Sequence, residues 1–398
     1  MPARRILALI ACLAVSPLAN ALNYNVSSLA DSGTGTLREA VGFANGTPNV
    51  PDTITFSVTG TITLTSGELV VTDTLSITGP GARKLTIDGN LNDRLFEVQT
   101  NTTNLSLSGL TLTRGLTNGN GGAILNNGGN LTLSFVRITG NQSGAEGGAI
   151  YDSFQADVGG NSVNFLTISN SEISINRANK NAGIFHSGFE LRIDNSTIHN
   201  NIAGDSVGGI LEQGGFATIR NSTISGNNAA VAVGGFQSQD STVTFESVLF
   251  ADNTDPSGPN DINRIGGGTV GATNSLFEED ISLAPAVLNG ANSGNLIAVE
   301  SQLPGALSNN GGPTNSARPP STSPAIGVGS NSQSYSFDQR GTGFARDAGG
   351  AVDIGAIQSF VEPRLVQLAK PVPGLGALPL ALLSLLVGLA GLARRRRR

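Results

Sequence analysis

Three residues whose side chains can transfer protons occupy equivalent places in the chain. Asp152, His186 and Glu212 each stand two residues after an isoleucine that small residues precede. Two carboxylic acids that face one cleft, roughly 5–10 Å apart, are the groups that hydrolysis of a glycosidic bond requires. The trio is therefore our candidate catalytic site, for a lyase or glycoside hydrolase acting on polysaccharides.

The same trio has a simpler interpretation. Asn126 and Ser238 take the equivalent place in neighbouring segments, and a stacked repeat puts polar residues at strand ends without any catalytic role. We therefore expect a solvated strand edge. Between Tyr151 and Phe165 the chain holds about nine extra residues, and such an insertion can build a binding wall on one face. His199, the other histidine, is expected in an exposed turn.

Features of other chemistries are few in the sequence. It contains no HExxH, GxSxG or CxxC motif, and Gly266–Gly268 lacks the aspartate of calcium-binding repeats. With no Trp and three Tyr, it offers few rings on which sugars could stack. We predict no cofactor and no metal site.

The trio belongs to a repeat of about 26 residues. Each copy opens with alternating apolar and polar residues, as in a β-strand. The copies start at Leu105, Leu131, Leu166, Leu191, Ala217 and Val243, with a weaker one at Val270. A second strand signal follows at Ile124, Ile150, Ile184, Ile210, Phe236 and Ile262. Several short strands per repeat, without room for a helix, predict an all-β fold, a parallel β-helix.

Columns of similar residues indicate that the repeats stack. Two columns are apolar, and two consist of asparagine: Asn141, Asn176, Asn201, Asn227 and Asn253, and then Asn170, Asn195 and Asn221. Because coils stack about 4.8 Å apart, we expect both asparagine columns to form ladders between coils. Asp194, Arg220 and Glu246 form an outward row of alternating charge, worth roughly 0.2–1 kcal/mol per pair, to which we assign no catalytic role.

The regular repeats occupy residues 105–280. The segments before and after them are predicted to cover the ends of the β-helix. Residues 22–104 form an N-terminal cap and the first coils, with a short amphipathic helix over residues 36–45 that begins with a capping box of Thr36 and Glu39. Residues 281–360, rich in Pro and Gly, are expected to form a C-terminal cap. Residues 361–374 are predicted to be a linker.

The first 21 residues are typical of a secretory signal peptide. Arg4 and Arg5 precede an apolar stretch, and Ala19 and Ala21 form a signal-peptidase site. Cleavage after Ala21 removes Cys12, the only cysteine, so the mature protein would contain no disulfide. The alternative is a lipoprotein, since residues 9–12 resemble a lipobox that would make Cys12 the lipid-modified N-terminus.

The C-terminus, residues 375–398, combines an apolar run with a basic tail. The run from Leu375 to residue 393 carries no charge and is long enough to span a bilayer. Five arginines, Arg394, Arg395, Arg396, Arg397 and Arg398, would stop it on the cytoplasmic side. The segment is either a retained anchor or a removable sorting signal. Pro371 and Pro373, directly before the apolar run, favour the sorting signal.

Several segments resemble families of bacterial surface proteins. GTGTLREAVGFAN (33–45) is similar to an LREA-type N-terminal domain, and the C-terminal end resembles exosortase sorting signals of the type that opens with Pro-Thr-Leu, with Gly374 in place of Thr. LSNNGGPT (307–314), SPAIGVG (323–329), DQRG (338–341) and DIGAIQ (353–358) resemble the choice-of-anchor region of right-handed β-helix proteins. The resemblance implies an exported, anchored right-handed parallel β-helix and no established reaction.

From these features we expect a protein of the cell envelope or cell surface, held at least transiently in the membrane, with a structural or adhesive role. The alternative is a polysaccharide-cleaving enzyme that uses Asp152, Glu212 and His186. Expected partners are signal peptidase, a membrane sorting peptidase, and a polysaccharide or host-cell ligand. The chain carries 23 Lys and Arg against 29 Asp and Glu, and the terminal segments hold arginines but no acid. An acidic body argues against nucleic acid as a partner.

Overall fold

A computed structural model of the 398-residue chain describes residues 21–99, 103–154, 164–281, 287–347 and 350–359. The chain divides into two compact units, residues 1–359 and 360–398, and the second lies wholly outside the described residues. The predicted signal peptide, linker and C-terminal apolar segment therefore stay predictions. No helix within the described ranges is both long enough and apolar enough to cross a membrane.

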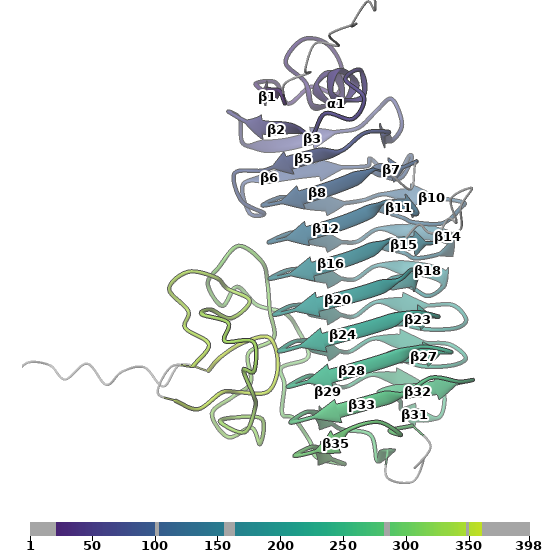
Figure 1. Cartoon of the computed structure of the whole chain (residues 1–398), viewed down its shortest axis with the longest axis vertical. Coiled ribbons are helices and arrows are strands. Elements are labelled where there is room, and N and C mark those ends of the chain that lie inside the picture. Colours follow the sequence, from purple (N-terminus) through teal and green to yellow (C-terminus); the bar gives the residue numbers. More distant parts are fainter. Residues whose placement is uncertain (1–20, 100–102, 155–163, 282–286, 348–349, 360–398) are drawn as a thin grey trace, which may run out of the picture. The chain divides into compact units, whose positions relative to one another are not determined.

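The described part of the first unit is a parallel β-helix of about nine turns with about 26 residues per turn, as predicted (Figure 1). Within these residues, the stacked strands form four sheets of 11, 10, 8 and 7 strands. Neighbouring strands are parallel, except for one antiparallel pair, β30 with β31. The two strand signals of each repeat correspond to the 11-stranded and 8-stranded sheets, and the short strands of the other two sheets were not predicted separately in the regular repeats.

The strands run along each sheet in order. Sheet 1 contains β1 (Asn23–Val26), β2 (Asp52–Phe56), β5 (Leu75–Thr78), β8 (Asn104–Ser108), β12 (Asn130–Ser134), β16 (Phe165–Ser169), β20 (Glu190–Asp194), β24 (Phe216–Arg220), β28 (Thr242–Glu246), β33 (Val270–Thr273) and β35 (Asn292–Ser293). Sheet 2 contains β3 (Gly60–Thr63), β6 (Leu85–Asp88), β9 (Thr111–Thr113), β13 (Arg137–Thr139), β17 (Glu172–Ser174), β21 (Thr197–His199), β25 (Thr223–Ser225), β29 (Leu249–Ala251), β34 (Leu276–Phe277) and β36 (Leu296–Ile297). Sheet 3 contains β4 (Leu69–Val71), β7 (Phe96–Val98), β11 (Ile124–Asn127), β15 (Ile150–Ser153), β19 (Ile184–Ser187), β23 (Ile210–Gln213), β27 (Phe236–Gln239) and β32 (Ile262–Ile265). Sheet 4 contains β10 (Leu116–Thr117), β14 (Gln142–Glu146), β18 (Arg177–Lys180), β22 (Ile202–Ala203), β26 (Asn228–Ala229), β30 (Thr254–Asp255) and β31 (Gly258–Pro259).

The predicted apolar columns form the core. In sheet 1 the inward residues stand in register on successive coils: Leu107, Leu133, Ile168, Ile193, Ile219 and Phe245. All of them are buried, and they belong to one continuous cluster that extends from Val26 to Val287. Each coil thus buries its apolar residues against its neighbours, so the core grows with the number of coils.

Helix α1 (Leu37–Asn45) closes the N-terminal end, as the sequence predicts. The Thr36 hydroxyl accepts a hydrogen bond from the Glu39 backbone N–H, and the Glu39 carboxylate accepts one from Gly35. The helix buries the face that the spacing of its apolar residues indicates: Leu37, Ala40, Val41 and Ala44. This face covers the apolar interior that the first coil would otherwise expose.

The first asparagine column forms the predicted ladder. The Asn141 side-chain amide donates to Asn176 Oδ1 at 3.0 Å, and the same bond repeats from Asn176 to Asn201, Asn227 and Asn253 at 2.9–3.0 Å. Each Oδ1 also accepts a backbone N–H from the preceding coil. These side chains are buried, and their hydrogen-bonding groups are all used.

The prediction for the second asparagine column is wrong in part. Asn170, Asn195 and Asn221 adopt the left-handed backbone expected of a turn, with φ between 44° and 51°. Their side chains do not bond to one another. They donate instead to backbone carbonyls of Asp338, Phe337 and Ser330, because the turn points them away from the coil stack toward a later part of the chain.

The described part of residues 281–360, expected as a C-terminal cap, lies in two places. Short strands β35 and β36 extend the last coil, while residues 308–347 and 350–358, called here the flanking segment, pack along the side of the β-helix (Figure 1). Its hydrogen bonds to the β-helix reach from Arg83 to Asn274. A fully buried guanidinium, Arg346, donates to the Asn195 side chain and to the carbonyls of residues 355 and 356. The segment is therefore fixed by polar contacts to the outward turns.

Candidate functional site

The fold brings the three candidate catalytic residues together. Asp152 on β15, His186 on β19 and Glu212 on β23 stand in register on three successive coils. The distance from His186 Nδ1 to Glu212 Oε2 is 2.6 Å, and that from His186 Nε2 to Asp152 Oδ2 is 3.5 Å. The imidazole therefore lies between the two carboxyl groups.

The expectation that this trio lies on a solvated edge is wrong, because all three side chains have zero exposure. The reason is the two-residue period of a strand: a residue two positions after a core isoleucine faces the core as well. Asn126 and Ser238 extend the same row and are also fully buried. A polar column thus runs through the interior of sheet 3.

The trio uses only part of its hydrogen-bonding capacity. The side-chain amides of Asn126 and Asn164 both donate to Asp152 Oδ1, at 2.7 and 3.1 Å. Among the described residues, Asp152 Oδ2, His186 Nε2 and Glu212 Oε1 find no hydrogen-bond partner. An unpaired polar atom in a dry interior lowers the stability of the fold. The trio therefore carries a free-energy cost that the asparagine ladder does not have.

Burial shifts the titration of the trio. It raises the pKa of Asp152 to about 6 and that of Glu212 to about 7, although the adjacent His186 opposes both shifts. For His186, burial alone would lower the pKa, but the Glu212 and Asp152 carboxyl groups outweigh it and raise the pKa overall. All three groups therefore hold protons more tightly in the folded chain than in the unfolded chain.

A buried trio cannot contact a polysaccharide in this conformation. A general acid or base must come within hydrogen-bond reach of the bond it helps to break, and coils above and below enclose these side chains. Nor do the described residues bring three His, Cys, Asp or Glu side chains into an arrangement that suits a metal ion. The trio is thus an internal polar cluster, and its chemistry is proton binding.

The second histidine is also buried, contrary to the predicted exposed turn. His199 lies in β21 with 4% exposure, and its Nδ1 is 3.0 Å from Ser225 Oγ on the next coil. Stacking against the Ser174 and Ser225 positions of adjacent coils covers it. Burial lowers the pKa of His199 to about 4, opposite in direction to His186.

An exposed feature that the sequence reasoning missed lies outside this column, where sheet 3 turns into sheet 1. Phe165, Phe189 and Phe216, called here the aromatic corner, pack edge to face with ring centroids 5.6 and 5.7 Å apart. Phe189 and Phe216 remain 41% and 49% exposed. The available signal was a phenylalanine directly before the opening strand segment of two copies, at 165 and 216.

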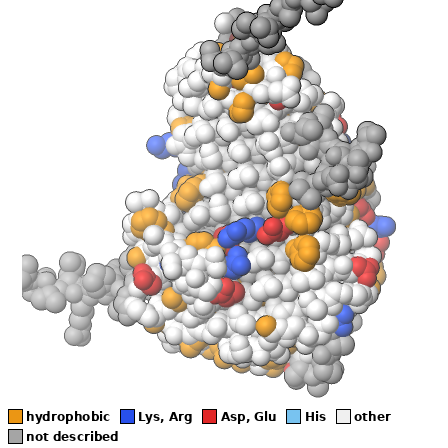
Figure 2. Space-filling view, in the orientation of Figure 1, with side chains coloured by type: hydrophobic (Ala, Val, Ile, Leu, Met, Phe, Trp, Pro, Cys, Tyr) orange, Lys and Arg blue, Asp and Glu red, His pale blue; other side chains and the backbone are white. Residues whose placement is uncertain are grey.

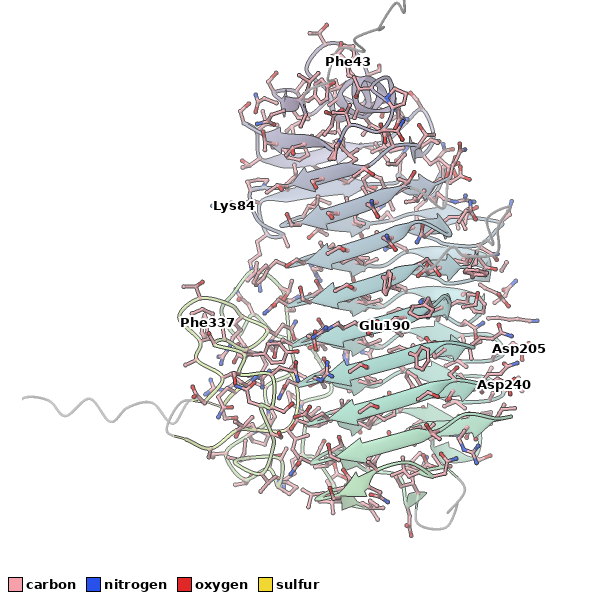
Figure 3. All side chains as sticks on the ribbon, in the orientation of Figure 1. Phe43, Lys84, Glu190, Asp205, Asp240 and Phe337 are labelled. Carbon is pink, nitrogen blue, oxygen red and sulfur yellow. The ribbon has the colours of Figure 1, made fainter. Side chains whose placement is uncertain are left out.

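Polar side chains adjoin the aromatic corner on the same face of sheet 1. Glu190 stands in register between Phe165 and Phe216, and the next outward row is Thr167, Arg192 and Thr218. Figure 2 shows the hydrophobic group beside acidic and basic side chains, and Figure 3 marks Glu190 at this place. Aromatic rings next to hydrogen-bonding groups are suited to a ligand with both apolar and polar faces.

The predicted charged row lies further along the same strands. Arg220 is 3.9 Å from Asp194 and 3.5 Å from Glu246, so opposite charges alternate between coils as expected. The Tyr335 hydroxyl of the flanking segment donates to Asp194 at 2.6 Å, and Ser330 donates to Glu246 at 2.7 Å. This row therefore also binds the flanking segment.

The predicted processing residues lie outside the described residues, with Ala21 as the exception. The residues outside the described ranges are Ala19, Pro371, Pro373, Leu375 and Arg394–Arg398.

In comparisons with known proteins, no protein-family model matches this chain and no curated protein matches it significantly. The β-helix and its two contrasting features, the buried trio and the aromatic corner, are thus the basis for any functional conclusion.

Proposed function

We propose that this chain is an exported, envelope-anchored β-helix surface protein with an adhesive role, and that it binds a polysaccharide at the aromatic corner. The observation that carries the proposal is the exposure of Phe189 and Phe216 on adjacent coils. Exposure of apolar rings to water is unfavourable, and a cluster of them on a surface is typical of a binding site.

The chemistry around the rings favours a sugar chain. The apolar C–H face of a pyranose ring can pack on a phenyl ring, while its hydroxyls need partners such as Glu190, Arg192 and Thr218 nearby. The rings follow the direction in which coils stack, so an extended glycan lying along that direction would meet one ring after another. The net charge of −6 favours a neutral chain over an anionic one.

The enzyme alternative receives no support from the trio. Asp152, His186 and Glu212 are enclosed by neighbouring coils, so cleavage through them would require the β-helix to open. We therefore propose retention of the ligand without turnover.

The test is adsorption of the full-length protein to cellulose and chitin, with analysis of the supernatant for released sugars. We expect binding without products. Replacing both exposed rings, Phe189→Ser with Phe216→Ser, is expected to weaken adsorption about tenfold or more, corresponding to about 1.4 kcal/mol or more. Phe43→Ser is the matched control, because Phe43 is 54% exposed on α1, far along the chain from the corner (Figure 3). Equal adsorption by the corner variant and the control would contradict the proposal.

Export and anchoring are tested separately, by mass analysis of the protein recovered from cells. Removal of the signal peptide predicts an N-terminus at Leu22. A C-terminus before about residue 378 supports a sorting peptidase, whereas peptides that extend to Arg394 support a retained membrane anchor. An intact N-terminal segment in protein recovered from the cytoplasm would contradict export.

A further inference from the structure

We infer that the buried trio controls the aromatic corner, so that ligand binding there depends on pH. The inference rests on the proposed function only for the identity of the ligand, since the connection between trio and corner is a property of the chain alone. The protonation state of the trio would thereby determine how well the aromatic corner binds its ligand.

The connection runs through Asn164, which is fully buried directly before β16. Its Nδ2 donates to Asp152 Oδ1 at 3.1 Å, and its Oδ1 accepts the backbone N–H of Phe189 at 3.1 Å. The backbone carbonyl of Asn164 accepts the N–H groups of Phe189 and Glu190 at 3.1 and 3.3 Å. One side chain therefore joins the Asp152 carboxyl group to the backbone that carries the central ring of the corner.

A second contact joins His186 to the same place. Gly188 immediately precedes Phe189, and a Cβ at position 188 would fall within 2.4 Å of His186 Nε2 and 2.7 Å of Asn164 Oδ1. The imidazole, the Asn164 amide and the backbone before Phe189 are thus in close contact. We expect a shift of the imidazole or of Asp152 to displace this backbone.

Proton number determines whether the trio fits together. His186 Nδ1 lies at hydrogen-bond distance, 2.6 Å, from Glu212 Oε2, whereas Nε2 lies 3.5 Å from Asp152 Oδ2. An imidazolium, with a proton on each nitrogen, presents an N–H to both carboxylates. This arrangement has a net charge of minus one. Loss of a further proton leaves two negative charges in a dry core and one nitrogen lone pair facing a carboxylate, which is repulsive. Raising the pH therefore loosens the contact between coils at Asp152 and His186.

Charged groups elsewhere do not compensate for this change. Among the described residues, the other side chains in this row or bonded to it are uncharged: Asn126 from β11, Ser238 from β27, and Asn164. Leu166 and Leu191, which stand in register on adjacent coils of sheet 1, are apolar and fully buried. Two side chains link Asp152 to the backbone outside the cluster: Asn126, which bonds to Gly129, and Asn164, which bonds to Phe189. The second link leads to the aromatic corner, and we expect it to transmit the loosening there.

The experiment combines a measurement without ligand and one with ligand. Hydrogen exchange of the Phe189 and Glu190 amides is followed in the full-length protein from pH 5 to pH 8, corrected for the intrinsic pH dependence of exchange. We expect protection to fall roughly tenfold, within the usual range of coupling between linked sites, while the Asn201 and Asn227 amides of the asparagine ladder stay protected. Adsorption to cellulose and chitin should weaken over the same interval by a similar factor.

The control variant is Asp152→Asn with Glu212→Gln, which removes both titrating carboxyl groups and nearly preserves their shapes. We expect exchange and adsorption to become independent of pH. Unchanged wild-type protection at Phe189 between pH 5 and pH 8, or an equal loss at the asparagine ladder, overturns the inference, and this arm needs no variant. If protection changes at Phe189 but neither polysaccharide is retained at any pH, the inference stands and the proposed ligand fails. If adsorption occurs with no pH dependence, the proposed function stands and the inference fails.

Discussion

Two polar columns run through the interior of this β-helix, and they differ in whether their hydrogen bonds are complete. In the asparagine ladder each side chain donates to the next coil and to a backbone carbonyl, and accepts in turn. In the sheet 3 column, Asp152, His186 and Glu212 leave one atom each without a hydrogen-bond partner among the described residues. The comparison teaches that stacking alone does not make a polar column structural: the neutral ladder stabilises, whereas the charged trio responds to pH.

The largest expected effect breaks the asparagine ladder. Asn201→Leu removes the acceptor for the backbone N–H and the side-chain amide of Asn176, and leaves the Ile173 carbonyl without its donor. Buried orphan groups cost roughly 1–3 kcal/mol each, so we expect a loss of about 4 kcal/mol in the free energy of unfolding. Chemical denaturation measures it. A loss below about 1 kcal/mol would mean that the ladder is not structural.

The next effect concerns the pH dependence of stability. Asp152 and Glu212 have folded-state pKa values of about 6 and about 7, above the ordinary 3.8 and 4.5, so the folded chain binds more protons. Folding is then increasingly disfavoured as pH rises from about 4 to about 7, and the raised pKa of His186 continues the trend above 6.5.

We expect the contribution of the trio to fall by on the order of 5 kcal/mol across this range, since the pKa values of Asp152 and Glu212 each rise by more than two and one pKa unit corresponds to about 1.4 kcal/mol. The difference between wild type and Asp152→Asn with Glu212→Gln isolates it from other buried acids such as Asp261, whose pKa burial also raises to about 7. Parallel stability curves for the two proteins would show that the trio does not titrate in this way.

A smaller effect separates the inner asparagine column from the outer one. Asn221→Gly keeps the left-handed backbone, with φ of 44°, and loses only the bond from the side chain to Ser330 O. We expect a cost of about 1 kcal/mol, in contrast to Asn201→Leu. Thermal unfolding provides the measurement, and equal losses for the two variants would remove the distinction between the columns.

The smallest effect belongs to the charged row. Arg220→Gln removes ion pairs with Asp194 and Glu246 at distances of 3.9 and 3.5 Å near the surface. Partly solvated pairs of this kind contribute roughly 0.2–1 kcal/mol, and added salt should reduce the difference. A salt-independent loss well above 1 kcal/mol would assign Arg220 a packing role instead.

The sequence predicts this fold well because each coil repeats the same local sequence pattern. Alternating residues from Leu105 onward, the glycine pairs before the second strand, and the capping box at Thr36 each specify a local structure that the neighbouring coil then reinforces. The register of the apolar columns follows directly from the period. The short strands of sheets 2 and 4 in the regular coils were not predicted as separate strands, since segments of two or three residues such as β21 and β22 show little alternation.

The site is less predictable because it depends on direction and on distant contacts. The two-residue period places His186 inside together with Ile184, and this inference was available from the sequence. The outward asparagines were not predictable in the same way, since Asn195 meets Arg346 from a segment 151 residues later. The aromatic corner joins Phe189 in a turn to rings at strand starts, and no single period describes that combination.

The central claim is that the trio is an internal proton-binding cluster and not an open catalytic edge. The chain has only two histidines, so the imidazole resonances of the full-length protein in a pH titration by NMR test it directly. We predict one imidazole, His186, whose pKa is raised above 6.5, and another, His199, that stays neutral down to about pH 4. Two imidazoles that both titrate near 6.5 would place the histidines in solvent and contradict the account.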